Sequence, residues 1–154
     1  VAGRWGITET LSLRANYTFT DSEQLSGAQK GLPLTNTARH MANASLNWQA
    51  NDRFSMQLLA EARSKRYRDT INGVRRDYQD YTVLHLGAQY RFNEHVTVSG
   101  RIYNLLDEDC TTFQTVFNDL NNDSIYTSNE VSYLDDYNNK DKSRNLWLSL
   151  NVSF

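Results

Sequence analysis

Hydrophobic and polar residues alternate along six stretches of this chain. The alternation is most regular in residues 145–154, where leucines, Val152 and Phe154 occupy every second position and polar or amphipathic side chains lie between them. A period of two places the apolar side chains on one face of a β-strand and the others on the opposite face. The pattern predicts strands at residues 11–19, 42–50, 54–62, 82–92, 96–104 and 145–154.

The predicted strands have the length and the polarity of strands that cross a lipid bilayer. A tilted strand of about 9–11 residues spans the hydrocarbon region. The apolar positions contain no Asp, Glu, Lys or Arg, whereas the other face carries Arg14, Glu61, Arg91 and Arg101. Soluble sandwiches also alternate. A lipid-facing Arg or Lys costs roughly 2–4 kcal/mol at mid-bilayer, so six strands without one exception favour a membrane barrel.

The connections between the strands alternate between short and long. Residues 51–52 and 93–95 are short and rich in Asn, Asp and Glu, which suits tight turns. The other connections, residues 20–41, 63–81 and 105–144, are long and are expected to be structureless. Short periplasmic turns and long extracellular loops are typical of outer-membrane barrels. The predicted fold class is all-β, an antiparallel up-and-down meander of about six strands.

Composition limits what else the chain can be. The 154 residues allow one domain, the net charge of −2 gives no reason to expect a nucleic-acid partner, and Cys110 is the only cysteine. Residues 4–9 are expected to form a strand end followed by a turn. Six strands are too few for a closed barrel, because bacterial single-chain barrels begin at about eight. Residues 1–154 are therefore expected to be a transmembrane barrel's C-terminal portion, without its earlier strands.

Five short segments resemble the last strands of TonB-dependent outer-membrane receptors, particularly the ferric catecholate siderophore and colicin receptor group. These segments are residues 17–23 (YTFTDSE), 31–37 (GLPLTNT), 40–43 (HMAN), 46–48 (LNW) and 103–107 (YNLLD). The sequence departs from the usual pattern at Ala38, where a proline is common, and at Cys110, where an aromatic residue is common.

The resemblance implies a barrel of about 22 strands in the bacterial outer membrane, plugged by an N-terminal domain that this chain lacks. It implies uptake of a ferric siderophore, with catecholate as the expected type, and with energy passed from TonB through the absent plug. Expected partners are outer-membrane lipid, lipopolysaccharide, the barrel assembly machinery and colicins. A terminal aromatic residue is part of the assembly signal in such barrels. The residues expected to carry that signal are Leu146, Leu148, Leu150, Val152 and Phe154.

The loop at residues 63–81 is the predicted ligand-binding region. Six cations outnumber its three carboxylates. An anionic ferric catecholate can be held by arginine and aromatic side chains through charge and cation–π contacts. The alternative is a solvated loop, or one that pairs with lipopolysaccharide phosphates. The candidate residues are Arg63, Lys65, Arg66, Arg68, Arg75 and Arg76.

The last long loop contains a partial match to a calcium-binding loop. Asp119, Asn121, Asp123 and Glu130 occupy positions 1, 3, 5 and 12 of that template, whereas Ser124 stands where the template has glycine. The alternative is a plain Asn/Asp turn. Apart from this candidate calcium, no tightly bound cofactor is expected. No nucleophile and base are visibly paired, so no enzyme activity is expected.

Two other classes of protein remain open on the sequence. One is a non-transporting outer-membrane barrel or adhesin, and the other is a soluble β-sandwich binding module. A barrel piece would require detergent, whereas a sandwich would remain monomeric in buffer.

Overall fold

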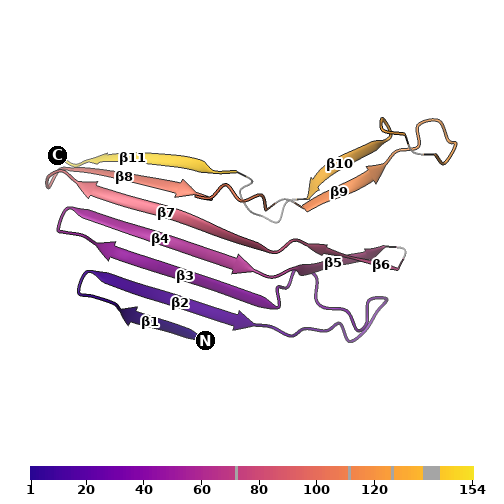
Figure 1. Ribbon diagram of the computed structural model, residues 1–154, viewed down its shortest axis with the longest axis horizontal. Coiled ribbons are helices and arrows are strands. Elements are labelled where there is room, and N and C mark those ends of the chain that lie inside the picture. Colours follow the sequence, from indigo (N-terminus) through magenta and orange to yellow (C-terminus); the bar gives the residue numbers. More distant parts are fainter. Residues whose placement is uncertain (72, 111, 126, 137–142) are drawn as a thin grey trace.

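The computed structural model is a single-layer antiparallel sheet with two small hairpins beyond one end (Figure 1). It describes residues 1–71, 73–110, 112–125, 127–136 and 143–154. The main sheet has seven strands in the order β1-β2-β3-β4-β7-β8-β11. These are β1 (Ala2–Gly6), β2 (Leu11–Phe19), β3 (His40–Gln49), β4 (Phe54–Arg63), β7 (Tyr81–Arg91), β8 (Val96–Tyr103) and β11 (Asn145–Val152). The all-β prediction and its six strands are confirmed.

Strand β1 agrees with the expectation of a strand end and turn at residues 4–9, because it ends at Gly6 and a short connection leads to β2, but it begins earlier, at Ala2. It pairs with β2 from Ala2 opposite Asn16 to Gly6 opposite Ser12. Its alternation is hidden because Gly3 occupies an apolar-face position without a side chain. A Cβ at Gly3 would lie 2.6 Å from ring atoms of Trp5. The glycine therefore makes room for the indole, and the period of two is lost from the sequence.

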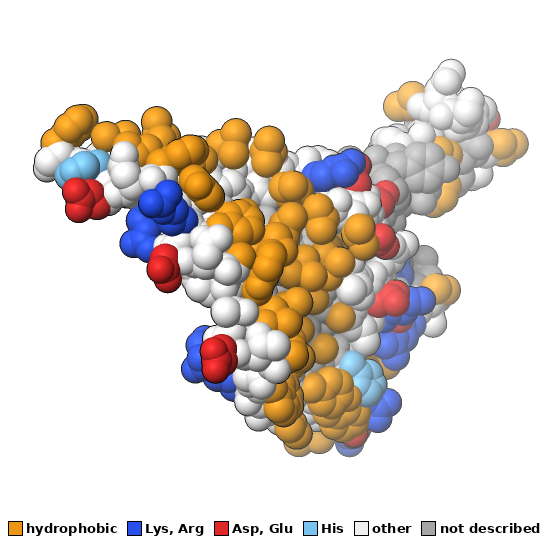
Figure 2. Space-filling view, turned by 60° about the vertical axis from the view of Figure 1, so that its left-hand side comes forward, with side chains coloured by type: hydrophobic (Ala, Val, Ile, Leu, Met, Phe, Trp, Pro, Cys, Tyr) orange, Lys and Arg blue, Asp and Glu red, His pale blue; other side chains and the backbone are white. Residues whose placement is uncertain are grey.

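Register keeps the two faces of the sheet chemically distinct. Leu13, Leu46, Leu58 and Leu86 lie opposite one another on successive strands. Hydrophobic side chains gather in a band over the sheet in Figure 2. Leu148 on β11 is 67% exposed. An apolar surface of this extent calls for lipid or another apolar phase.

The opposite face is polar, and side-chain hydrogen bonds connect some of its neighbouring strands. Asn47 and Gln57 lie opposite each other on β3 and β4, and the Gln57 amide donates to Asn47 Oδ1 at 2.8 Å. Among the described residues, no second sheet covers either face of the main sheet. That single layer disagrees with the sandwich alternative. The described part of the chain contains no helix with the length and hydropathy that membrane crossing requires.

Two short turns end in the same capping arrangement. The Asn51 side-chain oxygen accepts from the backbone N–H groups of Arg53 and Phe54, both at 2.9 Å. The Asn93 oxygen accepts from His95 at 2.9 Å and Val96 at 2.8 Å. Each asparagine thus satisfies two backbone donors that the hairpin turn would leave unpaired.

The expectation of structureless long loops is wrong for two of the three. The loop at residues 63–81 contains β5 (Arg66–Ile71) paired with β6 (Val74–Tyr78), and the last loop contains β9 (Thr112–Phe117) paired with β10 (Val131–Asp136). Both hairpins lie beyond the end of the sheet opposite the short turns (Figure 1). The Asn72-Gly73 pair was the available signal for the first hairpin, because this dipeptide favours two-residue hairpin turns. Gly73 has a φ of +77°.

The segment 103–107 forms a compact turn after β8. Asn104 has a φ of 50° and is 2% exposed. Its side chain accepts from the Glu108 N–H at 2.9 Å and donates to the Glu108 carbonyl at 2.8 Å. Asp107 then accepts from the backbone N–H of Arg144 at 2.7 Å. The turn therefore joins the two ends of the last long loop.

Candidate functional site

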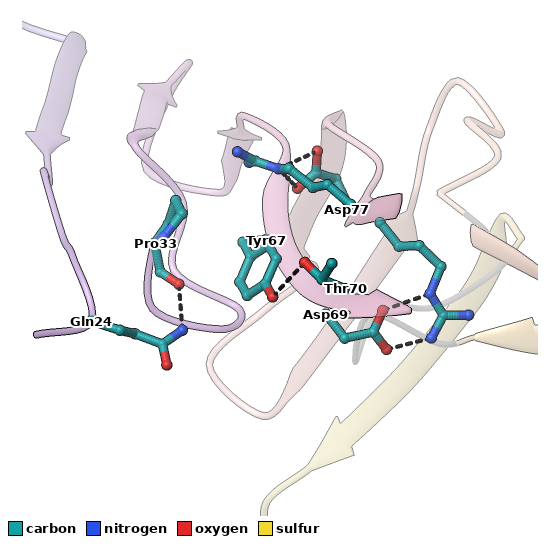
Figure 3. Close-up of polar contacts among 8 residues, drawn as sticks. Gln24, Pro33, Tyr67, Asp69, Thr70 and Asp77 are labelled. Atoms are coloured by element: carbon teal, nitrogen blue, oxygen red, sulfur yellow. Dashed lines mark hydrogen bonds and ion pairs between the residues drawn. The ribbon is translucent and has the colours of Figure 1, made fainter. Parts of the chain in front are cut away.

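The predicted basic loop is an ordered hairpin at the long-loop end of β4 and β7. Strand β5 pairs with β6 from Arg66 opposite Tyr78 to Ile71 opposite Val74, with a register shift between Tyr67 and Asp69. Tyr67 is 1% exposed, and its hydroxyl hydrogen-bonds the Thr70 hydroxyl at 3.0 Å (Figure 3). These contacts hold together the hairpin that carries the basic residues.

Three arginines of the hairpin are close to its own carboxylates. Arg76 donates to both oxygens of Asp69, and Arg75 Nε lies 2.9 Å from Asp77 Oδ1 (Figure 3). Arg68 Nε lies 3.6 Å from Asp69 Oδ2. The hydrogen bond from Arg76 lowers the pKa of Asp69. Burial opposes this change, and the positive charges of Arg76 and Arg68 lower the pKa further. Carboxylates of the hairpin itself thus compensate much of the positive charge of its arginines.

Arg66 is enclosed where the hairpin joins the sheet. Only 2% of the residue is exposed. Its guanidinium carbon lies 5.3 Å from the ring centre of Tyr78 and 5.5 Å from that of Tyr81, within the range of cation–π contacts. Burial lowers the pKa of Arg66, with the two tyrosines acting in the opposite direction. The position favours anchoring of the hairpin over direct contact with solvent.

Arg66 also connects the hairpin to the loop between β2 and β3. Its Nη1 donates to Asn36 Oδ1 at 3.0 Å, and the Asn36 N–H donates to the Tyr67 carbonyl at 2.8 Å. Nε and Nη2 of Arg66 have no hydrogen-bond partner among the described residues. Two loops far apart in sequence are therefore held together at one buried cation.

The remaining two candidate cations differ in their surroundings. Arg63 Nε lies 3.0 Å from Glu61 Oε1, which also accepts from the Tyr81 hydroxyl at 3.0 Å. Lys65 is exposed, and no ion pair joins it to a described residue. Among the six predicted residues, Lys65 is thus the exposed cation without an ion pair in the described part of the chain, whereas the Arg68 side chain is 14% exposed and lies near Asp69.

The predicted calcium residues lie together in the loop between β9 and β10, but as a hydrogen-bonded turn. Asp119 accepts from the N–H groups of Asp123 and Ser124 at 3.2 and 2.9 Å. The Asn121 side chain donates to Asp123 at 2.9 Å. No group of three or more His, Cys, Asp or Glu residues in the described parts of the chain is arranged to hold a metal ion.

Glu130 closes this turn from the other side. Its Oε1 accepts from the Leu120 N–H at 3.0 Å, while Oε2 accepts from the Thr127 N–H at 2.9 Å and the Thr127 hydroxyl at 2.7 Å. The Thr127 N–H and hydroxyl, followed by other backbone N–H groups, lower the pKa of Glu130. The geometry accounts for these residues without a cation, and calcium binding stays a prediction.

The predicted assembly stripe lies on the outward face of the edge strand β11. Leu146, Leu148 and Leu150 are 66%, 67% and 65% exposed, and Val152 is 41% exposed. The strand ends at Val152, so Phe154 lies just beyond it. The structure places the stripe where lipid would cover it, while its role as an assembly signal stays a prediction.

Most of the main sheet matches a known protein family. The family described as "TonB dependent receptor-like, beta-barrel" matches residues 1–105, more than half of the 154-residue chain. The chain belongs to this family. The predictions of a TonB-dependent receptor barrel, of an outer-membrane location and of a protein that is not an enzyme are confirmed.

Curated relatives match two thirds or nearly all of this chain. The iron-regulated outer membrane virulence protein of Vibrio cholerae is 29% identical over 150 residues, which are 96% of this chain and 20% of that protein. The ferric enterobactin receptor PirA of Pseudomonas aeruginosa is 29% identical over 109 residues, 66% of this chain and 14% of the receptor. The chain thus spans about a fifth or less of the length of these relatives.

Solved structures share the fold at low sequence identity. A ferric enterobactin receptor, PfeA, from Pseudomonas aeruginosa superposes with a TM-score of 0.69 and 19% identity over 99% of this chain and 21% of that chain. The ferric-catecholate import receptor Fiu from Escherichia coli superposes with a TM-score of 0.61 and 18% sequence identity. The match covers 96% of this chain and 19% of that chain. The observed sheet is therefore an arrangement that occurs within complete receptors.

Proposed function

We propose that this chain is the C-terminal portion of a TonB-dependent receptor barrel that takes up a ferric siderophore, with catecholate as the expected type. The observation that carries the proposal is the family match of residues 1–105 on a sheet with one polar and one apolar face. Relatives named as iron-regulated and ferric enterobactin receptors support the choice of cargo. The plug and its contact with TonB would belong to the rest of the protein.

In this proposal the β5–β6 hairpin contributes to the first contact with an anionic cargo. The hairpin lies beyond the end of the sheet opposite the short turns (Figure 1). In outer-membrane barrels that end faces the outside. Lys65 is exposed there, and Arg68 lies 5.7 Å from the ring centre of Tyr78. A cation beside an aromatic ring suits a ligand that is both anionic and aromatic.

The test is binding and uptake by the complete receptor. We expect Lys65→Gln combined with Arg68→Gln to weaken binding of ferric enterobactin by about threefold to tenfold at low salt, because Lys65 is exposed, Arg68 lies beside Tyr78, and surface charges contribute about 1 kcal/mol or less each. The control is Arg75→Gln, which removes a hairpin cation that is paired with Asp77 and lies over Tyr67, not over Tyr78. The defined measurement is a ligand titration at two salt concentrations, followed by iron-55 uptake in cells that lack other receptors.

The outcome separates the proposal from its alternatives. A complete protein that binds no ferric siderophore and transports no iron would favour the non-transporting barrel or adhesin. Normal siderophore affinity in the double variant would remove this hairpin from the binding site and leave the family assignment intact. The barrel assembly machinery, lipopolysaccharide, colicins and calcium stay as predicted partners or ligands. Calcium is tested by titrating the complete receptor with calcium and comparing Asp119→Asn with the parent.

A further inference from the structure

Strand β8 leaves its ladder with β7 at an irregular point that needs an extra hydrogen-bond acceptor. The paired register of the two strands ends at Leu86 opposite Ile102. Continued by two residues, this register would place Asn104 opposite Leu84, but it is the Leu105 N–H that donates to the Leu84 carbonyl, at 2.7 Å. The Asn104 N–H thus donates to no backbone carbonyl of the described chain. Asn104 is 2% exposed, so water has little access to this donor.

The His85 side chain supplies the missing acceptor. Its Nδ1 accepts the Asn104 N–H at 3.1 Å. The imidazole also makes an edge-on contact with Tyr103, and the two ring centres are 5.6 Å apart. A ring nitrogen that accepts a hydrogen bond carries no proton, so this neutral imidazole has its proton on Nε2. The hydrogen bond therefore exists in one of the three protonation forms of histidine.

Asn104 is the residue on which the base of the last long loop depends. Its side chain exchanges two hydrogen bonds with Glu108, and its carbonyl accepts from the Asp107 N–H at 2.9 Å. Asp107 in turn accepts from the N–H of Arg144, just before β11, at 2.7 Å. The bond to His85 thus fixes the first member of a series of contacts that joins both ends of residues 105–144.

The ring of His85 is open to proton exchange on the polar face of the sheet, where it lines a cavity of about 600 Å³. The titratable or charged groups on the elements around it are Arg4 of β1, Arg14 of β2, Glu61 and Arg63 of β4, Tyr81 of β7, Arg101 and Tyr103 of β8, and Asp107, Glu108, Asp109 and Cys110 after β8. Arginine stays protonated, carboxyl groups ordinarily titrate near about pH 4, and thiols and phenols titrate above about pH 8. Between about pH 5 and 8, histidine is therefore the group of this set whose charge changes.

We propose that His85 is a pH-sensitive latch for the base of the last long loop. While Nδ1 is unprotonated, the imidazole holds the Asn104 N–H and the turn after β8 stays closed. Uptake of a proton from water onto Nδ1 places one N–H donor against another, so the hydrogen bond is lost. The Asn104 N–H is then buried without an acceptor, which favours opening of the turn to water.

The direction of the effect follows from the bond itself. Only the neutral ring can accept, so the latch is closed at the upper end of the histidine range, about pH 8, and is released as the pH falls toward about pH 5. This inference goes beyond the proposed cargo, because it concerns the attachment of a loop and not the ligand that the receptor binds.

The state of the ring is tested first, in the complete receptor folded in detergent micelles. Nitrogen NMR of receptor labelled with ¹⁵N-histidine distinguishes the two neutral forms, and the His85 signals are those that disappear in His85→Asn. At about pH 7.5 we expect an unprotonated Nδ1 and a protonated Nε2. A neutral ring protonated on Nδ1, or a ring already doubly protonated at this pH, would overturn the proposal.

Hydrogen-exchange mass spectrometry of the same receptor measures the latch. The informative peptides cover residues 103–108 and 143–148, and rates are corrected for the intrinsic pH dependence of amide exchange. In the parent, the protection of both segments should fall roughly tenfold between about pH 7.5 and about pH 5.5, where carboxyl groups are still mostly ionised. Equal corrected protection at the two pH values would contradict the latch.

Three variants separate the acceptor from the ring. His85→Asn keeps an acceptor, because Asn Oδ1 is bonded to Cγ as Nδ1 is in histidine, and it cannot take up a proton; its segments should stay protected at both pH values. His85→Phe keeps a ring against Tyr103 without an acceptor and should show low protection at both. His95→Asn is the matched control, because His95 lies in a short turn at the other end of the sheet, and it should behave as the parent does.

Two outcomes among the variants would also overturn the proposal. A loss of protection in acid that persists in His85→Asn would assign the effect to another group. Parent-like protection in His85→Phe at about pH 7.5 would show that the turn does not need the acceptor. The NMR result and the pH profile of the parent stand even if a His85 variant fails to fold.

Ferric enterobactin binding at neutral pH is measured on the same samples. Normal siderophore binding without a pH-dependent loss of protection defeats this inference alone. A pH-dependent latch in a receptor that binds no ferric siderophore supports the inference and defeats the proposed cargo alone.

Discussion

The Arg66 guanidinium donates a 3.0 Å hydrogen bond to the side-chain oxygen of Asn36, thirty positions earlier in the chain. This contact joins the loop after β2 to the hairpin after β4. An isolated β-bridge between Ala38 and Arg66 lies beside it. The two loop segments therefore form one supported unit, although the sequence presents them as separate loops.

Replacing Arg66 should loosen this unit. Arg66→Met keeps an apolar stem of similar length and removes the hydrogen bond to Asn36 and both cation–π contacts. We expect faster amide hydrogen exchange at Asn36 and along β5, equivalent to about 1–3 kcal/mol of lost local stability. Hydrogen-exchange mass spectrometry of the complete receptor measures this. Arg75→Met, at an exposed ion pair in the same hairpin, is the control. Equal exchange in both variants would contradict the anchoring role.

The β5–β6 hairpin should weaken in acid because of Asp69. The hydrogen bond and charge of Arg76 lower the folded-state pKa of Asp69 below the ordinary value of 3.8. A lowered carboxyl pKa contributes stability that is fully present above the unfolded-state pKa and is lost as pH falls through the folded-state pKa. The loss should therefore occur below about pH 4.

Carbon NMR of the Asp69 carboxyl group follows the titration directly, and hairpin amide exchange follows its consequence. Asp69→Asn should have a weaker hairpin at neutral pH and a smaller further loss in acid. A hairpin whose exchange is equally sensitive to acid in the parent and in Asp69→Asn would assign the effect to other carboxylates.

A charged side chain on the outward face of β11 should destabilise the barrel. Leu148 pairs with Gly100 of β8 and is 67% exposed toward the expected lipid. Leu148→Lys should destabilise the complete barrel by roughly 2–4 kcal/mol if the position lies near mid-bilayer. Folding into lipid vesicles, followed by urea titration, gives the change in free energy of unfolding. Ser149→Lys places the same charge on the opposite face and should change it by much less. A larger loss of stability in Ser149→Lys than in Leu148→Lys would mean that the face carrying Ser149, and not the face carrying Leu148, contacts lipid.

The short turns should depend on their asparagine side chains. Asn51→Ala removes an acceptor for two backbone N–H groups and should cost about 1 kcal/mol in free energy of unfolding. Asn51→Asp should retain most of the stability because a carboxylate oxygen can accept from the same donors. Asp52→Ala is the control, because Arg91 contacts the Asp52 backbone carbonyl and not its carboxylate. A larger loss in Asp52→Ala than in Asn51→Ala would contradict the capping role.

The sequence by itself determined which face of each spanning strand is apolar. Alternation is a local property, because the strand geometry at Leu146 or Leu148 already fixes the opposite direction of the neighbouring side chain. The same holds for the short turns, since Asn51 and Asn93 accept hydrogen bonds from residues only two and three positions away. The family followed from short segments whose order along the chain is itself sequence information.

Only the tertiary structure decided the rest, because it depends on which strands lie opposite one another. The full extent of strand β1 became visible only through its pairing with β2, since Gly3 hides the alternation. Counting charges predicted an open basic loop, whereas register and folding place Arg76 on Asp69 and enclose Arg66 between two tyrosines. Ala44 and Ala60, sixteen positions apart, likewise lie opposite each other only because β3 pairs with β4. Pairing between segments that are distant in the sequence sets these contacts, and no local sequence pattern encodes that pairing.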